Sequence, residues 1–200
     1  MIRLFDLLLS FILLVICIPV FLLLSFWIMV DSRGRVIYRQ RRVGRFGKEF
    51  SMLKFRTMYD KNDSKLLLTV GEGDKRITPV GHYLRKFKLD ELPQLVNVFV
   101  GDMSIVGPRP EVKKYVDLYT AEQKEILNVR PGITDYASIA YANENELLAG
   151  QKDPEQFYID KIMPEKIKLN RLFIDRPTVG NYFKIILLTA KKITGKKNSA

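Results

Sequence analysis

The sequence predicts a mostly α-helical α/β domain attached to a membrane, and three observations support this prediction. Residues 7–30 form an uncharged apolar run, residues 32–56 carry nine basic side chains against one acid, and the remainder mixes helix and strand patterns without an internal repeat. We therefore expect residues 1–31 to insert into a membrane and residues 32–200 to fold at its surface. A length of 200 residues suits one such domain.

The apolar run from Leu7 to Val30 reads LLLSFILLVICIPVFLLLSFWIMV and is bracketed by Asp6 and Asp31. At ~1.5 Å per helical residue it reaches roughly 36 Å, which is enough to cross a bilayer core. A secretory signal peptide explains the run less well, because it needs a shorter apolar region, a basic start and a small-residue cleavage site. Arg3 is the only basic residue before the run.

The basic residues after the apolar run predict its orientation. By the positive-inside rule, the chain that follows stays on the cytoplasmic side. The same side chains can contact anionic lipid headgroups, at about 1 kcal/mol each near the surface. The net charge of +11 also points to partners that carry phosphate or other negative charge. The single cysteine, Cys17, excludes a disulfide within the chain and any multi-cysteine metal site.

Pro19 lies near the middle of the apolar run. It removes one backbone donor, and its ring collides with the carbonyl four residues earlier, at Val15. Two structures fit this pattern equally well on physical grounds. One is a kinked helix that spans the membrane, and the other is a re-entrant helix–break–helix with both ends on the cytoplasmic side.

The rest of the chain contains signals for both strands and helices. Val36–Val43 and Phe50–Met58 are rich in β-branched and aromatic residues, and the intervening Gly44–Lys48 predicts a small β-hairpin. Lys61–Lys75 is polar and contains glycine, so we expect a loop there.

Helix starts are indicated at three places. Pro110 can open a helix, Thr120 with Gln123 forms a capping box, and Asp153–Pro154 is a cap followed by proline. The last segment, Asn181–Ile193, is basic and amphipathic but too short to span a bilayer. It either lies in the membrane interface or packs against the core, and the sequence favours neither.

A pair of adjacent acids, Asp90 and Glu91, is the strongest candidate for chemistry. Asp90 is predicted to be a helix N-cap, with Pro93 tolerated in the first turn. The apolar residues that follow at helical spacing are Leu92, Leu95, Val96 and Phe99. Most such pairs only cap helices. Because neighbouring helical residues point about 100° apart, the two carboxylates suit separate tasks rather than sharing one proton.

Arginines on stiff turns accompany the acids. Arg85 precedes Asp90 by five residues, and Arg109 and Arg130 lie in the strings Gly-Pro-Arg-Pro and Arg-Pro-Gly. A guanidinium on a rigid turn favours bidentate binding of phosphate. Each arginine by itself is more often a surface charge, so their convergence on one site is a hypothesis.

Several strings together resemble one family. They are Lys54-Phe55-Arg56-Thr57-Met58, then LDELPQLVNVFVGDMSIVGPRP over Leu89–Pro110, then Arg-Pro-Gly-Ile-Thr from Arg130. These resemble the signatures of the bacterial sugar transferases, the small monotopic phosphoglycosyl transferases. The resemblance covers nearly the whole chain, including the apolar N-terminal run.

The resemblance implies an activity. The enzyme would transfer a sugar-1-phosphate from a UDP-sugar to polyprenyl (undecaprenyl) phosphate, giving a polyprenyl-diphospho-sugar and UMP. The reaction would depend on Mg²⁺ and would begin the assembly of a glycan such as a capsule, O-antigen, exopolysaccharide or glycoprotein glycan. It would take place at the cytoplasmic face of the bacterial inner membrane, and no nucleic-acid partner is expected.

The resemblance also implies roles for residues. Asp90 matches the nucleophile and a metal contact, and Glu91 matches its partner in an Asp-Glu dyad. Residues that match basic positions near the phosphates are Lys54, Arg85, Arg109 and, as a weaker extension, Arg130. The family further implies the re-entrant form of the N-terminal helix. Two departures stand out: Ile18 precedes Pro19 where the family often has serine, and Asp135 follows Thr134 where many members have a Gly-Leu-Ala-Gln-like stretch.

Two other functions compete with this one. A membrane-anchored basic binding protein would explain the charge and the anchor, but not the acidic pair beside stiff arginine turns. A conventional glycosyltransferase that passes only the sugar would release UDP, and its usual Asp-x-Asp metal motif is absent from the sequence. The oligomeric state and the sugar are not indicated.

Overall fold

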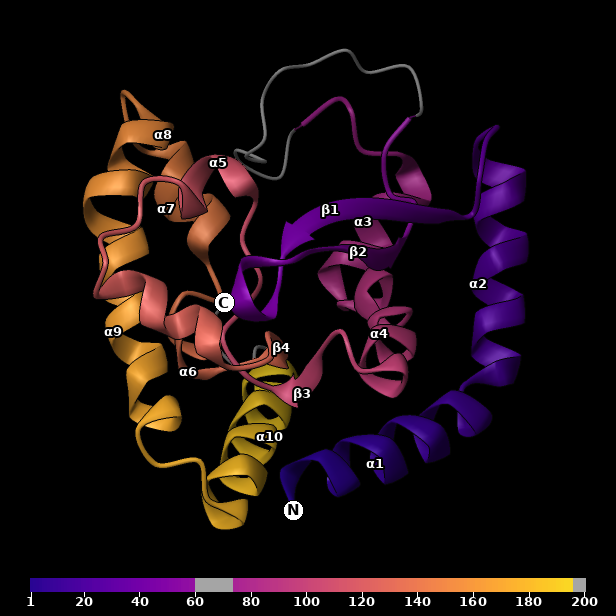
Figure 1. The fold of residues 1–200 in the computed structure, drawn as a ribbon. Helices are drawn as coiled ribbons and strands as arrows, with labels where there is room; N and C mark the ends of the chain where they lie inside the picture. The colour runs from indigo at the N-terminus through magenta and orange to yellow at the C-terminus, as the bar shows by residue number, and fades with distance from the viewer. Residues whose placement is uncertain (60–73, 196–200) are drawn as a thin grey trace.

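The computed structural model describes residues 1–59 and 74–195. Most of the described chain is helical, and it surrounds a two-stranded antiparallel hairpin (Figure 1). A second, very short pair of parallel strands lies between the helices. The predicted mostly α-helical domain with a small hairpin is therefore confirmed. The loop expected over Lys61–Lys75 falls almost wholly outside the described residues.

Two helices make up the N-terminal apolar segment. Helix α1 (Ile2–Ile16) and helix α2 (Ile18–Asp31) meet at Cys17 and are bent by 60°. Pro19 stands in the first turn of α2, where a backbone N–H is not needed, and this explains why the chain breaks there. Among the described residues, no single helix is long and apolar enough to cross a membrane, although α1 and α2 together have that length and composition.

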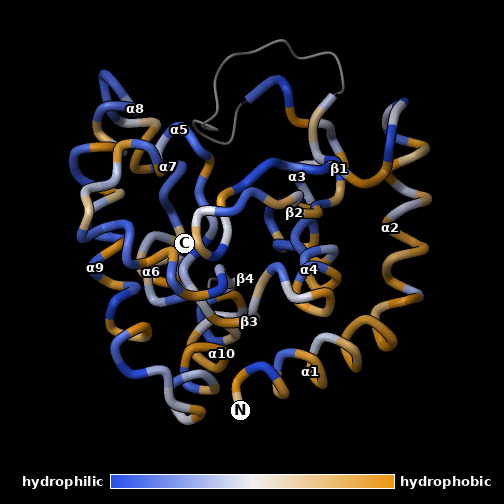
Figure 2. Tube along the Cα trace, viewed as in Figure 1, coloured by the Kyte–Doolittle hydropathy of each residue, from blue (hydrophilic) through white to orange (hydrophobic). Residues whose placement is uncertain are grey.

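Large apolar side chains remain exposed along both helices, which appear as an orange band in Figure 2. The most exposed are Leu4, Phe11, Ile16, Leu22, Leu23, Phe26, Met29 and Val30. The opposite side of each helix packs on the domain. Leu24 and Ile28 of α2 are buried against Phe55 and Leu84, and Phe5 of α1 packs with residues of the last helix. An exposed apolar face of this extent indicates an interaction surface.

Charged side chains tie both ends of this segment to the domain. Near the start of α1, the Arg3 guanidinium donates to the carbonyls of Val98 (2.6 Å) and Phe99 (2.9 Å). At the end of α2, Arg56 donates to the Ser32 carbonyl at 2.5 Å and to the Ser32 hydroxyl at 3.0 Å. Each arginine satisfies carbonyls that a helix C-terminus leaves unpaired.

Asp6 of α1 is buried, with 2% of its surface exposed, although the sequence places it merely at the edge of the apolar run. Its Oδ1 accepts hydrogen bonds from the Ser104 hydroxyl, the Ile105 N–H and the Tyr182 hydroxyl, each at 2.9 Å. The Tyr182 hydroxyl titrates far above its usual range, because burial and then the nearby Asp6 carboxylate raise its pKa. One carboxylate thus joins α1 to two distant segments of the chain.

The hairpin consists of β1 (Ile37–Val43) and β2 (Glu49–Phe55), paired from Ile37 opposite Phe55 to Val43 opposite Glu49. The turn between them, η1 (Arg45–Gly47), has positive φ at Phe46 and Gly47. This confirms the predicted hairpin, although the second strand ends at Phe55 rather than Met58.

Helix α3 (Pro79–Lys86) is followed by a 3₁₀ turn, η2 (Leu89–Glu91), and by helix α4 (Gln94–Val100). The predicted N-cap at Asp90 is wrong, because Asp90 lies inside the 3₁₀ turn and caps nothing. An N-cap side chain accepts from the second or third N–H of its helix, and the third position here would be Pro93, which has none. The predicted apolar face is also displaced: the buried residues of α4 are Gln94, Leu95, Asn97 and Val98, while Phe99 is 42% exposed.

Strands β3 (Ser104–Val106) and β4 (Gly132–Thr134) are parallel neighbours. A Cβ on Gly132 would lie 2.1 Å from the Gly107 nitrogen, so only glycine allows this approach. Between the strands lie α5 (Lys113–Val116) and η3 (Gln123–Asn128).

The helix start expected at Pro110 is wrong. Residues 110–112 are extended, and the Val43 N–H donates to the Glu111 carbonyl at 2.8 Å, so this stretch pairs with the end of β1 instead. The capping box of Thr120 and Gln123 is confirmed, with hydrogen bonds of 2.9 and 3.2 Å between each side chain and the other's backbone N–H.

The C-terminal part is helical. Its elements are α6 (Tyr136–Ala140), α7 (Glu144–Ala149), α8 (Pro154–Phe157), the π-helical turn η4 (Tyr158–Ile162), α9 (Met163–Ile174) and α10 (Val179–Thr194). Asp153 caps α8 as predicted, accepting from the Gln156 N–H at 3.0 Å.

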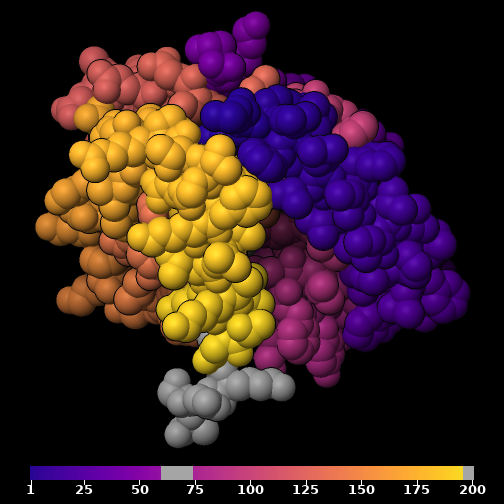
Figure 3. Space-filling model, turned by 90° about the horizontal axis from the view of Figure 1, so that it is seen from below, coloured from indigo at the N-terminus to yellow at the C-terminus, as the bar shows by residue number. Residues whose placement is uncertain are grey.

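The core-packing alternative for the last helix is confirmed for one of its sides, and the alternative that it lies in the membrane interface stays a prediction. Tyr182 and Ile185 of α10 are fully buried against α1, whereas Leu187 is 69% exposed and Ile193 is 51% exposed. Figure 3 shows α10 and α1 side by side on one face of the molecule. The helix therefore packs on the core through one side and presents apolar residues with the other.

Candidate active site

The acidic pair sits where the 3₁₀ turn meets the hairpin. Lys88 precedes the turn with a left-handed backbone (φ 57°), which redirects the chain after α3. Asp90 is buried, with 7% of its surface exposed, and its Oδ1 has no hydrogen-bond partner among the described residues. A buried carboxylate oxygen without a donor is costly, and such atoms mark sites that serve a ligand or a reaction.

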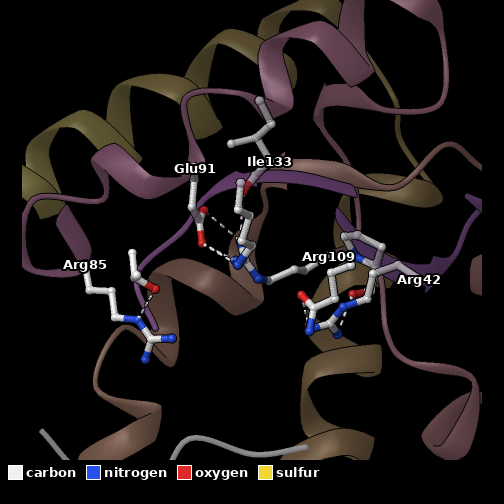
Figure 4. A network of polar contacts seen from close by, with 9 residues as sticks. Arg42, Arg85, Glu91, Arg109 and Ile133 are labelled. Carbon is white, nitrogen blue, oxygen red and sulfur yellow. Dashed lines mark hydrogen bonds and ion pairs between the residues drawn. The ribbon is translucent and has the colours of Figure 1, made fainter. Parts of the chain in front are cut away.

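Both carboxylate oxygens of Glu91, in contrast, have partners. Its two oxygens are held by the fork of Arg109, in a contact of 3.1 Å from Nη1 to Oε2 and a second from Nη2 to Oε1 (Figure 4). The Lys54 ammonium lies 3.4 Å from Oε1. The three side chains are largely withdrawn from water, with 14% of Glu91, 18% of Lys54 and 28% of Arg109 exposed.

These surroundings shift the two carboxyl groups in opposite directions. Burial, and then the neighbouring Glu91 charge, raise the pKa of Asp90 above its ordinary value. Burial alone would raise the pKa of Glu91 as well, but Arg109 and Lys54 outweigh it and hold that pKa well below its usual range. Glu91 is therefore held as an anion, whereas burial and Glu91 disfavour the ionised form of Asp90 more than the nearby cations favour it.

Burial also lowers the pKa of the Lys54 ammonium, and the Glu91 charge opposes this effect. The pKa of the Arg109 guanidinium is raised instead, chiefly by the Glu91 charge. Its backbone is fixed too: the Arg109 N–H donates to Asp135 Oδ2 at 2.7 Å, and the other oxygen of Asp135 accepts from the Ser138 N–H.

Arg85 approaches from α3. Its Nε donates to the Thr57 hydroxyl at 2.9 Å, and its charge lowers the pKa of Asp90 (Figure 4). No described residue accepts a hydrogen bond from its two terminal nitrogens. Burial lowers the pKa of Arg85, and the Asp90 charge opposes this effect.

Arg130 is placed elsewhere. Its Nε donates to the Gly101 carbonyl at 2.9 Å, at the end of α4, and it makes no contact with the other predicted site residues in the described part of the chain. The structure thus brings together five of the six predicted residues: Lys54, Arg85, Asp90, Glu91 and Arg109.

The residues that hold this cluster in place were not predicted from the sequence. Thr57 orients Arg85, and Asp135 fixes the backbone of Arg109. Asn97 ties α4 to the second strand, accepting from the Leu53 N–H and donating to the Ser51 carbonyl, both at 2.9 Å. Thr57 and Asn97 lie inside the quoted strings, but only the tertiary contacts reveal these roles.

The donors available to a metal are few. Among residues 1–59 and 74–195, no group of three or more His, Cys, Asp or Glu side chains could hold an ion. Glu91 is engaged by two cations, which leaves Asp90 as the carboxylate of the pair that makes no ion pair among the described residues. This fits Mg²⁺ bound through one carboxylate and the phosphates of a substrate, and does not fit a cage built by the protein alone.

Comparison with known proteins assigns the chain to a family. The family described as bacterial sugar transferase matches residues 1–196. The chain belongs to the bacterial sugar transferase family. This sugar transferase is 38% identical over 192 residues to the uncharacterized sugar transferase EpsL of Bacillus subtilis, covering 96% of this chain and 86% of that one.

Other relatives of this sugar transferase carry more specific names. It is 34% identical over 184 residues to a UDP-glucose:undecaprenyl-phosphate glucose-1-phosphate transferase of Caulobacter vibrioides, covering 90% of this chain and 65% of the relative. A protein of the same name in Escherichia coli is 34% identical over 165 residues, which cover 78% of this chain and 35% of that one. The family predicted from the three sequence strings is confirmed.

Proposed function

We propose that this protein transfers a sugar-1-phosphate from a UDP-sugar to polyprenyl phosphate, with Asp90 as the nucleophile. The observation that carries the proposal is the contrast within the acidic pair. Asp90 keeps an unpartnered oxygen beside cations, while Glu91 is fully engaged by Arg109 and Lys54. Relatives whose names specify transfer of glucose-1-phosphate to undecaprenyl phosphate support the reaction class.

In the first step, an oxygen of Asp90 attacks the phosphorus that bears the sugar. The bond between that phosphorus and the bridging oxygen breaks, and UMP leaves with the bridging oxygen. In the second step, an oxygen of polyprenyl phosphate attacks the same phosphorus. The bond between that phosphorus and the Asp90 oxygen breaks, the polyprenyl-diphospho-sugar is released, and Asp90 returns as a carboxylate. Such covalent catalysis divides one difficult transfer into two easier ones.

The cations make attack by an anion on an anion feasible. Arg85 offers two terminal nitrogens to phosphate oxygens, and its charge already acts on Asp90. Lys54 and Arg109 contribute further positive charge while Glu91 fixes their positions. Preorganised charges of this kind stabilise the transition state without reorganising during the reaction. Mg²⁺ held by the Asp90 carboxylate would supply additional neutralisation.

Glu91 serves in this proposal as an anchor. Its depressed pKa makes it a poor proton carrier near neutral pH. Its two oxygens accept the fork of Arg109, and this geometry holds the guanidinium rigidly beside Asp90.

We also propose that the N-terminal helix pair is re-entrant, with both ends on the cytoplasmic face of the bacterial inner membrane. Arg3 and Asp6 bind the domain at the start of α1, and Arg56 of the same domain binds the end of α2. A helix that crossed the bilayer would separate these two ends by the membrane thickness. The exposed apolar face of the pair supplies the inserted surface, and the basic residues 32–56 suit anionic headgroups.

The reaction is tested by identifying the released nucleotide. Purified protein in detergent is incubated with undecaprenyl phosphate, Mg²⁺ and each of several UDP-sugars. We expect sustained UMP release that depends on both lipid and metal, beyond the one UMP per enzyme that the first step can release without lipid. The sugar that supports most release identifies the donor. Release of UDP instead would assign a conventional glycosyltransferase and remove the role of Asp90.

The topology is tested with single cysteines in a Cys17→Ser background. Ile2→Cys and Arg35→Cys are each labelled in intact spheroplasts and in inside-out vesicles with a membrane-impermeant maleimide. Labelling of both positions only in inside-out vesicles supports the re-entrant pair. Labelling of Ile2→Cys in spheroplasts would mean that the helix spans the membrane.

A further inference from the structure

Gln94 is a buried side chain to which the proposed mechanism assigns no role. It opens α4 and has 0% of its surface exposed. Neither its Nε2 nor its Oε1 has a hydrogen-bond partner among the described residues. Buried amides are normally paired, and each exception needs an explanation.

Asn97, one turn further along the same helix, shows what a structural amide looks like here. Its Oδ1 accepts from the Leu53 N–H and its Nδ2 donates to the Ser51 carbonyl, both at 2.9 Å. Asn97 therefore fixes α4 to β2. Gln94 makes no such link, so the attachment of the helix does not account for its amide.

The neighbour of Gln94 that matches it chemically is Asp90. The two residues are four apart along a run of helical turns, and both side chains are buried, so both lie on the inward side of that run. Asp90 Oδ1 is itself buried without a donor, and Gln94 Nε2 is a donor without an acceptor. The two groups are complementary, although no hydrogen bond joins them in this structure.

We infer that Gln94 is a positioning residue for Asp90: its Nε2 donates to Oδ1 when the carboxylate reacts, so that Oδ2 faces the phosphorus. This inference rests on the proposed function of Asp90 as nucleophile. Direct contact between Gln94 and the substrate is ruled out by the complete burial of its side chain. A hydrogen bond to one oxygen fixes the rotation of the carboxylate and supports its ionised form.

The test replaces the amide by an apolar group of similar length, Gln94→Met. The readouts are the rapid release of UMP from a UDP-sugar without lipid, the KM for that UDP-sugar, the affinity for UDP, and the melting temperature. We expect UMP release to slow at least tenfold, with KM and UDP affinity within twofold of the wild type. The melting temperature should be unchanged or higher, because two unpaired polar atoms are removed.

Leu95→Met is the matched control, because Leu95 is buried on the same helix and the change is also to methionine. It should leave the rate of UMP release within twofold. Gln94→Leu serves as a second apolar variant if methionine disturbs the packing. Together the variants separate loss of the amide from a general change of the core.

Two results would overturn the inference. Gln94→Met and Gln94→Leu that release UMP at the wild-type rate would show that the amide has no part in the reaction. A slower rate accompanied by an equal loss of UDP affinity and a lower melting temperature would assign Gln94 a purely structural role. Failure of the proposed function is distinguishable from both, because the wild-type protein itself would then release no UMP.

Discussion

The adjacent carboxyl groups should respond to the same chemical change with opposite effects on stability. Glu91→Gln removes the charge that holds two largely buried cations, Lys54 and Arg109. Breaking a buried ion pair costs about 3–5 kcal/mol, and the partial exposure of both cations reduces this to about 2–4 kcal/mol of unfolding free energy. Asp90→Asn instead removes a carboxylate whose burial and repulsion by Glu91 outweigh its attraction to Lys54 and Arg85, and should stabilise the protein by about 1–3 kcal/mol.

The sign of the pH dependence follows from the two pKa shifts. The stabilisation by Glu91, whose pKa is lowered on folding, is present above its unfolded value of about 4.3 and is lost only as the pH falls through the folded value. The penalty from Asp90, whose pKa is raised on folding, is present above its folded value and vanishes below the unfolded value of about 3.9. Both effects are therefore fully developed well above the folded pKa of Asp90.

The assay is thermal melting in detergent with Mg²⁺ chelated, followed by circular dichroism. Fluorescence is less suitable because Trp27 is the only tryptophan, and it stacks on Tyr83 at a centroid distance of 6.0 Å, so it reports the contact of α2 with α3. For a chain of this size, 1 kcal/mol shifts the Tm by about 2–4 °C. A Tm that falls in Asp90→Asn, or does not change in Glu91→Gln, would refute this account of the site's electrostatics.

Three further variants test other contacts. Asp6→Ala should lower the unfolding free energy by about 3 kcal/mol, because three buried donors lose their acceptor, while Asp6→Asn should lose less; equal stability of wild type and Asp6→Ala would contradict the described network. Gly81→Ala should lower both Tm and UMP release, because its Cβ would lie 2.2 Å from the Thr57 carbonyl oxygen, and normal values would argue against this packing. Arg109→Lys should raise the KM for the UDP-sugar about tenfold, since lysine cannot reproduce the fork on Glu91, and an unchanged KM would separate that fork from substrate binding.

Local signals predicted much of the fold. The turn residues Gly44–Lys48, the capping box at Thr120 and the cap at Asp153 each depend on neighbouring residues alone, and each is confirmed. The prediction at Pro110 was wrong, because the backbone of that stretch pairs with a strand far away in sequence. Cap and turn chemistry can be read locally, whereas pairing partners cannot.

In the candidate site, too, the residue types could be predicted from local sequence, but their contacts could not. The strings that contain Lys54, Asp90 and Arg109 predicted which residues belong to it, but not how the acids differ. That difference arises from tertiary contacts: the Arg109 fork engages Glu91 and leaves Asp90 unpaired. The role of Asp6 could not be predicted from the sequence. There it marks the polar edge of an apolar segment, but in the structure it is buried and links α1 to β3 and α10.

Peptide mapping by mass spectrometry can detect a sugar phosphate attached covalently to Asp90. The protein is incubated with Mg²⁺ and the UDP-sugar that supports turnover, without lipid, and is then quenched and digested. We expect the mass of one sugar phosphate on the peptide that contains Asp90, and its loss when polyprenyl phosphate is added before quenching. Lipid-dependent UMP release by Asp90→Asn at the wild-type rate, or an adduct on a different residue, would contradict the account.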